Sequence, residues 1–218
     1  MIVLLQSQPK RRWGAAPAKS SRSLVALRRL QEHPAVMNHE DSPIRLPASM
    51  SDGAIVLDAH TLADAEAHWR GEDDEMRRRF ESPRRATLDD ARAAIGRWIE
   101  ARAAGGPNFA YALRTPAGAL MGGCEMQRLG PGRANVSYWV FPGFRGRGHA
   151  ARALRLLRAA AAEIVDLRQL EAHIDQDNFA SRRVAEAAGF GEAGVVEDES
   201  WSGELSTRML YVWAVQGG

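Results

Sequence analysis

The sequence holds a single cysteine, Cys124, among its 218 residues. One thiol cannot form an internal disulfide or a cysteine zinc site, so we expect a protein of the reducing cytoplasm. No apolar run approaches the ~20 residues that span a bilayer, and we expect no membrane association. The histidines lack a metal-binding spacing such as H-E-x-x-H, which predicts that the protein has no metal site.

Lysine is also scarce, because Lys10 and Lys19 are the only two in the chain. Residues 1–50 carry eight Lys/Arg against three Asp/Glu, whereas residues 51–218 carry 21 against 24. The basic surplus therefore belongs to the N-terminal segment, and not to one face of a folded domain. This distribution argues against a nucleic-acid partner.

The first fifty residues differ from the rest in composition. They hold five prolines and show no sustained hydrophobic periodicity, so we expect 1–50 to be a disordered basic extension and 51–218 to be the folded domain. The Arg/Ser-rich, acid-poor start loosely resembles a transit peptide. Alternatively, Met37 or Met50 is the true start of the protein.

From residue 54 the hydrophobic pattern becomes regular and alternates between the periods of strands and helices. The predicted strands are 54–60, 109–115, 120–129, 135–141, 169–175 and two near 193–200 and 207–215. The predicted helices are 61–71, 87–106, one that follows the glycines near 148, and 179–188. The acidic clusters at 71–75 and 197–200 are typical of solvated loops.

The stretch WVFPGFRGRGHAARAL, residues 139–154, is the most informative segment of the chain. A strand breaks at Pro142-Gly143, two arginines stand among glycines, and an alanine-rich helix begins at once. Backbone N–H groups next to glycine, a helix N-terminus and guanidinium groups together form an anion site. The segment therefore predicts that a phosphate group binds here.

One interpretation of this loop is a dinucleotide site. Gly146, Gly148 and Ala151 satisfy G-x-G-x-x-A, and Asp175 at the end of the next strand would contact the ribose. In such a site, however, the strand normally runs directly into the first glycine, whereas residues 142–145 intervene here. A dinucleotide-binding oxidoreductase is therefore kept as an alternative.

The second interpretation rests on two motifs. Arg145, Gly148 and Ala150 form R-x-x-G-x-A, and the segment NFASRRVAEAAGF, residues 178–190, follows after one predicted helix and one predicted strand. Over residues 54–215 the sequence thereby resembles the GNAT (GCN5-related) acetyltransferase superfamily. It is most similar to the branch with ribosomal-protein N-terminal alanine/serine acetyltransferases and some aminoglycoside acetyltransferases.

The resemblance implies an α+β fold with a central, mixed, mostly antiparallel sheet of about six to seven strands flanked by helices. It implies an N-acyltransferase that moves acetyl from acetyl-CoA to a primary amine by direct attack. The acceptor would be a small molecule or a peptide N-terminus, and the protein a monomer or homodimer. A catalytically silent acyl-CoA-binding sensor is the other alternative. In this fold the two acidic clusters would border the acceptor entrance and attract a cationic amine.

The resemblance also assigns a coenzyme site. Amides of residues 145–150 would bind the pyrophosphate, two arginine side chains would reach phosphates, and Asn178 would bind the pantetheine arm. A β-bulge would free one strand amide to polarise the thioester carbonyl. The coenzyme-binding residues predicted in this way are Val140, Phe141, Arg145, Gly146, Arg147, Gly148, His149, Ala150 and Asn178.

Catalysis requires that the amine lose a proton and that the departing thiolate be stabilised. Many family members place a tyrosine seven residues after the motif asparagine, where this chain has Ala185. Ser181 or a bound water is the expected substitute, although Ser181 could instead cap a helix. Glu125, on a central strand, is the predicted base, with an exposed strand glutamate as the alternative. Cys124 is expected in the core and not as a nucleophile.

Overall fold

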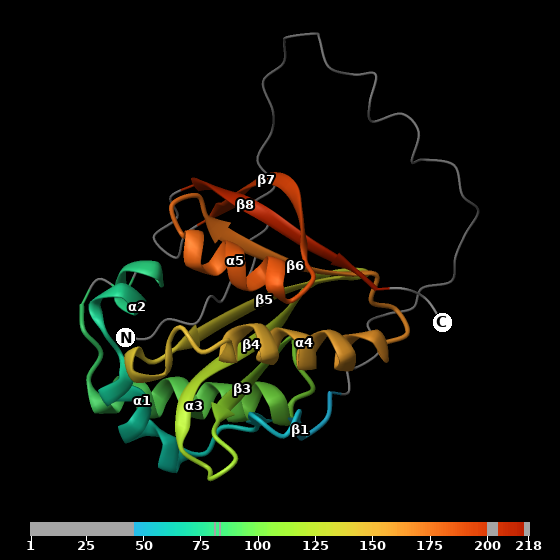
Figure 1. Ribbon diagram of the computed structural model, residues 1–218. Helices are drawn as coiled ribbons and strands as arrows, with labels where there is room; N and C mark the ends of the chain where they lie inside the picture. Colours follow the sequence, from blue (N-terminus) through green and yellow to red (C-terminus); the bar gives the residue numbers. More distant parts are fainter. Residues whose placement is uncertain (1–45, 81, 83, 200–204, 216–218) are drawn as a thin grey trace, which may run out of the picture. The chain divides into compact units, whose positions relative to one another are not determined.

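A computed structural model describes residues 46–80, 82, 84–199 and 205–215, so most of the predicted extension lies outside the described residues. Within them the strands form one sheet in the order β1-β2-β3-β4-β5-β6-β8-β7 (Figure 1). All neighbours are antiparallel except β5 and β6. The strands are β1 (Ser49–Ser51), β2 (Val56–Asp58), β3 (Asn108–Arg114), β4 (Leu120–Gly130), β5 (Arg133–Val140), β6 (Gln169–Asp175), β7 (Gly191–Glu199) and β8 (Leu205–Ala214).

The eight-stranded sheet is one strand larger than the upper limit predicted from the sequence. The additional strand is β1, whose three residues are too few to show a period of two. Leu46 and Met50 pack against the core, and the Tyr111 hydroxyl donates to the Pro47 carbonyl at 2.7 Å. The sheet therefore begins shortly before residue 51.

Five α-helices and two short 3-10 helices accompany the described strands. The helices are η1 (Leu62–Asp64), α1 (Ala65–Gly71), α2 (Asp74–Arg79), α3 (Leu88–Ala103), η2 (Pro142–Phe144), α4 (His149–Ala162) and α5 (Phe179–Ala187). Helix α2 begins at Asp74, inside the segment 71–75 that was predicted to be a solvated loop. Its first turn is acidic and its last turn basic, which complements the helix dipole, and the Asp73 carboxylate accepts from the Met76 amide at its start.

The helices cover both faces of the sheet, which gives three layers (Figure 1). On one face Leu154 and Leu157 of α4 and Ala185 of α5 belong to the larger hydrophobic core. On the other face Ile95 and Trp98 of α3 pack against side chains of β3 and β5 in a second core. This arrangement confirms the predicted α+β fold with a mixed, mostly antiparallel sheet.

Strands β5 and β6 pair over only a short distance. Their parallel register runs from Arg133↔Gln169 to Asn135↔Glu171, although β5 continues to Val140 and β6 to Asp175. Beyond Asn135 the two strands therefore diverge, and their facing edges no longer exchange hydrogen bonds. The sheet also contains one parallel pair instead of a series of βαβ units, so the dinucleotide interpretation of the glycine loop is wrong.

Candidate active site

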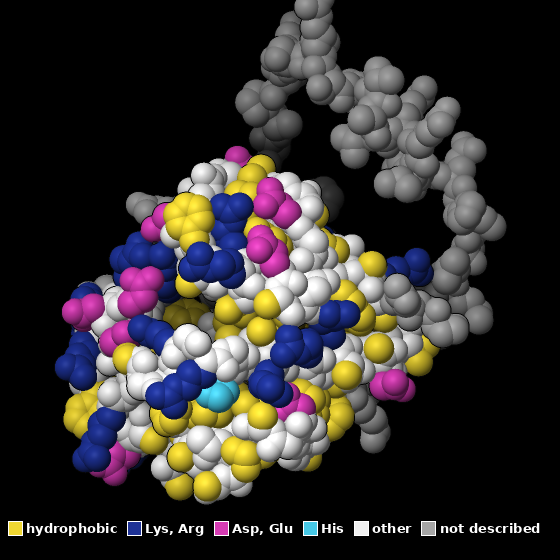
Figure 2. Space-filling view, in the orientation of Figure 1, with side chains coloured by type: hydrophobic (Ala, Val, Ile, Leu, Met, Phe, Trp, Pro, Cys, Tyr) yellow, Lys and Arg dark blue, Asp and Glu magenta, His cyan; other side chains and the backbone are white. Residues whose placement is uncertain are grey.

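The diverging ends of β5 and β6 border a cavity of about 580 Å³. On the face that carries α4 and α5, a recess with hydrophobic side chains opens between dark-blue arginine side chains (Figure 2). The walls come from α2, β5, the glycine loop, α4, β6 and α5. The predicted site residues among them are Val140, Arg145, Gly146, Gly148, His149, Ala150, Asn178 and Ser181.

The glycine loop has the backbone of an anion site. Gly146 and Gly148 adopt φ of +74° and +76°, and a Cβ at either position would meet no heavy atom within 4 Å. Gly148 is the N-cap of α4, whose first turn contains no acidic residue. The helix therefore presents its N-terminal amides and positive dipole end to open space, as a pyrophosphate requires.

The two predicted phosphate-binding arginines differ in their surroundings. Arg145 is bound to Asp73 through both Nη atoms and to the Val140 carbonyl through Nε at 2.8 Å, and its amide donates to the Pro142 carbonyl. Arg147 is exposed and has no partner among the described residues. Of the two side chains, only that of Arg147 is uncommitted within the described part of the chain.

The end of β5 supplies a candidate donor for a thioester carbonyl. The Phe141 amide donates to the Met121 carbonyl at 2.8 Å, and the Phe141 ring packs in the second core. In an antiparallel pair alternate residues face the partner strand, so the Val140 amide points away from β4, toward the cavity. The register shows no bulge here, because Gly122↔Val140 through Arg128↔Ala134 pair without a shift. This edge of β5 is free because β6 diverges from it, and not because of the predicted bulge.

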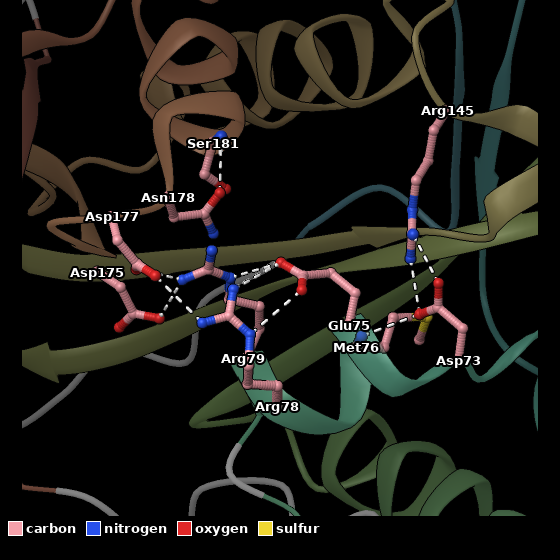
Figure 3. Close-up of polar contacts among 10 residues, drawn as sticks. All are labelled: Asp73, Glu75, Met76, Arg78, Arg79, Arg145, Asp175, Asp177, Asn178 and Ser181. Carbon is pink, nitrogen blue, oxygen red and sulfur yellow. Dashed lines mark hydrogen bonds and ion pairs between the residues drawn. The ribbon is translucent and has the colours of Figure 1, made fainter.

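The first turn of α5 faces the same cavity (Figure 3). Asn178 is the N-cap, and its side-chain oxygen accepts from the Ser181 amide at 3.1 Å. Ser181 is thus capped and does not cap the helix itself, which removes the structural role considered for it. The Tyr138 hydroxyl donates to the Ser181 carbonyl at 2.9 Å. The Ser181 hydroxyl has no partner among the described residues.

Glu125 lies beside the cavity and does not line it. Its strand neighbours are Ser137, which lines the cavity, and Ala110, which belongs to the second core. The carboxyl group is buried, and its Oε1 has no hydrogen-bond partner in the described structure. Burial raises the pKa of Glu125 to about 8. The exposed strand glutamate considered as its alternative is therefore wrong.

The acidic residues at the start of α2 do not form a free negative patch. Asp73 binds Arg145, Asp74 binds Arg77 at 3.0 Å, and Glu75 binds Arg79 at 2.8 Å. Because Asp73, Asp74 and Glu75 are each matched by a guanidinium group and Glu72 is buried, this cluster does not present an isolated acidic surface to a cationic amine. The second cluster is not the predicted loop over residues 197–199, because these residues end strand β7. Glu197 is exposed, whereas the side chains of Asp198 and Glu199 and all of Ser200 lie outside the described residues.

Several cavity residues were not found from the sequence. The sequence predicts a strand through Tyr138 and Trp139 and places neither in the site, although the alternation of β5 puts their side chains on opposite faces of the cleft wall. Arg183 of α5 lines the cavity and has no partner in the described part of the chain. The adjacent arginines Arg182 and Arg183 of α5 are the available signal in the sequence for a second phosphate contact.

Neither a metal-binding cluster nor a membrane-spanning helix is found among the residues that the structure describes. No group of three or more His, Cys, Asp or Glu side chains there could hold a metal ion. No helix in the same residues is long and apolar enough to cross a membrane. Cys124 is buried, and burial together with the nearby Glu125 raises the pKa of its thiol, as expected for a core residue.

Comparisons with known proteins agree with this fold. The microcin self-immunity acetyltransferase MccE, solved with acetyl-CoA and AMP, is 17% identical with a TM-score of 0.65, covering 80% of this chain and all (100%) of that one. The ribosomal-protein alpha-N-acetyltransferase RimL, solved with coenzyme A, is 18% identical with a TM-score of 0.61, covering 78% and 97%. RimJ of Mycobacterium smegmatis is 20% identical with a TM-score of 0.62, covering 79% and 86%.

At these identities the structural neighbours establish the fold alone. No curated protein sequence matches the chain. The family model for the acetyltransferase (GNAT) domain matches residues 54–191, which is more than half of the sequence. The chain therefore belongs to the GNAT acetyltransferases, and it uses acetyl-CoA to acetylate an amine.

Proposed function

We propose that the protein transfers the acetyl group directly to a primary amine that enters the cleft between β5 and β6 from the side of α2. The divergence of these strands carries the proposal, because it joins the glycine loop and the first turn of α5 in one cavity. The acceptor would be a small molecule or a peptide N-terminus. An aminoglycoside acetyltransferase of 15% identity and RimL are the structural neighbours that suggest these two classes.

The coenzyme would be held mainly by backbone. Amides from Gly146 to Ala150 would bind the pyrophosphate, and the free edge of β5 at Val140 would pair with the pantetheine arm as an added strand does. The Asn178 side chain uses its oxygen as the helix cap, so its NH₂ group would donate to that arm. Arg147 and Arg183, both without described partners, would contact the 3′-phosphate.

When bound, acetyl-CoA supplies an acetyl thioester that is activated toward attack by an amine. The Val140 amide would donate to the carbonyl oxygen, where negative charge develops. The Ser181 hydroxyl would donate a hydrogen bond to the sulfur as it gains charge, with water as the final proton source. Tyr138 keeps its proton, since burial raises its pKa to about 12, and it holds the Ser181 carbonyl.

Glu125 is the proposed base. Its pKa of about 8 lies close to neutrality, where a general base is most effective. Its neighbour across the strand pair, Ser137, lines the cavity, so the carboxyl group lies one side chain away from the wall. A proton that leaves the amine would pass the Ser137 side chain before it reaches the Glu125 carboxyl group.

Thermal unfolding and a thiol-release assay test this function together. Acetyl-CoA should raise the melting temperature and NADH should not, because only a ligand that binds the folded protein stabilises it. Free thiol should then appear with at least one member of a panel of small amines and peptides. A shift with acetyl-CoA but no thiol release across the panel would support the silent sensor. No shift with acetyl-CoA would contradict the proposed coenzyme site.

A further inference from the structure

Something other than the sheet must fix the width of the cleft. The hydrogen bonds between β5 and β6 end at Asn135↔Glu171, so the sheet does not hold the coenzyme-binding end of β5 against the end of β6. Helix α2 lies across this region and contributes Glu75, Met76 and Arg79 to the cavity wall (Figure 3). Its two ends are bound to the two sides of the cleft.

The first end of α2 is bound to the glycine loop. Arg145 Nη1 lies 2.6 Å from Asp73 Oδ2, and Arg145 Nη2 lies 2.9 Å from Asp73 Oδ1, which is a bidentate ion pair. The same carboxylate accepts from the Met76 amide at 2.9 Å as the helix cap. The hydrogen bond from Arg145 is the main cause that lowers the pKa of Asp73. All three guanidinium nitrogens of Arg145 are thus engaged, the third by the Val140 carbonyl.

The second end of α2 is bound to the β6–α5 turn. Arg79 Nη1 lies 3.2 Å from Asp175 Oδ2 and 2.5 Å from Asp177 Oδ1. Arg78 Nη1 lies 3.1 Å from Asp177 Oδ2. Asp177 directly precedes Asn178, the cap of α5. Because the Arg79 side chain is only 15% exposed and the Asp175 side chain 34%, solvent screens this ion pair less than it screens a surface pair.

We propose that α2 is a bridge between the two sides of the cleft and sets its width. In this bridge Arg145 and Asp73 are positioning residues through which α2 orders the coenzyme loop. This inference rests on the proposed coenzyme site. It changes the role expected for Arg145, whose side chain acts on the loop through Asp73 and Val140 and not on a phosphate. The two ion-paired ends replace the strand pairing that β5 and β6 lack.

Coenzyme A titrations separate this role from direct phosphate binding. Asp73→Asn keeps a capping oxygen but loses the charge and the bidentate pair, so it should weaken coenzyme A binding about tenfold, as Arg145→Ala should. The double variant should bind no more weakly than Arg145→Ala, because Arg145→Ala already removes the link to Asp73. Arg145→Lys should resemble Arg145→Ala, since lysine offers a point charge without the fork. Asp74→Asn, whose exposed pair with Arg77 lies in the same turn, should leave affinity unchanged.

Hydrogen exchange of the free protein gives a second measurement that needs no ligand. Amides in residues 76–80 should exchange about tenfold faster in Asp73→Asn and Arg145→Ala than in wild type or Asp74→Asn. The proposed bridge would be wrong if Asp73→Asn left both exchange and coenzyme A affinity unchanged while Arg145→Ala lost affinity. That result would show that the Arg145 side chain binds a phosphate directly. If wild type does not bind coenzyme A, the proposed function fails, while the exchange rates still test the bridge through α2.

Discussion

The Tyr138 hydroxyl donates to the backbone carbonyl of Ser181 at 2.9 Å, which joins β5 to the first turn of α5 across the coenzyme end of the cleft. The Ser181 amide is bound by the Asn178 side chain at 3.1 Å. Both backbone groups of Ser181 are therefore held, while its hydroxyl has no partner among the described residues. A fixed residue with an unused hydroxyl suits a donor to a departing sulfur.

Ser181→Ala should lower kcat by about 10- to 100-fold, the effect of losing one hydrogen bond to a charged group. Coenzyme A affinity should stay near that of wild type, and the free energy of unfolding should change by less than about 0.5 kcal/mol, because the hydroxyl does not cap the helix. Asn178→Ala is the matched comparison and should cost about 1 kcal/mol of stability. Steady-state kinetics and urea unfolding measure both.

Tyr138→Phe distinguishes the two hydroxyl groups at this turn. It should lower the free energy of unfolding by about 1 kcal/mol, because a buried hydrogen bond is lost. The kcat of Tyr138→Phe should stay above that of Ser181→Ala. A larger kcat loss in Tyr138→Phe than in Ser181→Ala would assign the donor role to the phenol.

Gly148→Val should abolish coenzyme A binding. The residue has φ of +76° and open space around its Cβ position, so a branched side chain would stand where the pyrophosphate approaches the backbone. Gly118→Val provides the control, since Gly118 has φ of +89°, equally open surroundings and a place in the β3–β4 turn. Both should lose about 1–2 kcal/mol of stability to backbone strain. Calorimetry should then find binding in the control alone.

Local chemistry explains which parts of the site could be predicted. The glycine loop and the position of Asn178 follow from short motifs, and the structure brings both to one cavity. The pair Arg145–Asp73 joins residues 72 positions apart, and Tyr138–Ser181 joins residues 43 apart, so neither follows from local pattern. Helix α2 is not predicted because the five charged residues around Met76 carry no apolar periodicity. Its acidic start and basic end were the remaining signal.

His68 should make the protein sensitive to acid. The side chain is buried, neither ring nitrogen has a partner among the described residues, and burial lowers its pKa to about 3. The unfolded chain takes up the proton near pH 6.5, before the folded protein does. The free energy of unfolding should therefore fall as the pH drops from about 6.5 toward 3. Above that window His68 should contribute nothing to the pH dependence of stability.

Two substitutions at His68 separate the titration from the cost of a buried polar group. His68→Gln should remove this part of the pH dependence, and His68→Phe should in addition raise stability at pH 7, because no polar atom remains unpaired. Urea unfolding at several pH values measures these differences. Parallel curves for wild type and His68→Gln between pH 4 and 7 would show that His68 does not titrate as expected.

Glu125 should have the opposite pH dependence and, as the proposed base, a separate effect on rate. Burial raises its pKa from 4.5 to about 8, so the folded protein keeps the carboxyl protonated while the unfolded chain ionises it. Its contribution to stability is therefore present below about pH 4.5 and is lost as the pH rises toward 8. Glu125→Gln cannot ionise, so it should be more stable than wild type at pH 8 and nearly equal at pH 4.5.

The rate should respond differently, because catalysis needs the ionised form. Wild-type kcat should rise with pH through about 8, and Glu125→Gln should lower kcat by about 100-fold or more, the usual share of general base catalysis. The acceptor amine also loses its proton as the pH rises, so the comparison with Glu125→Gln at each pH isolates the carboxyl group. A variant that gains stability at pH 8 while keeping kcat within threefold of wild type would leave Glu125 as a buried core residue and place the base elsewhere on the cleft.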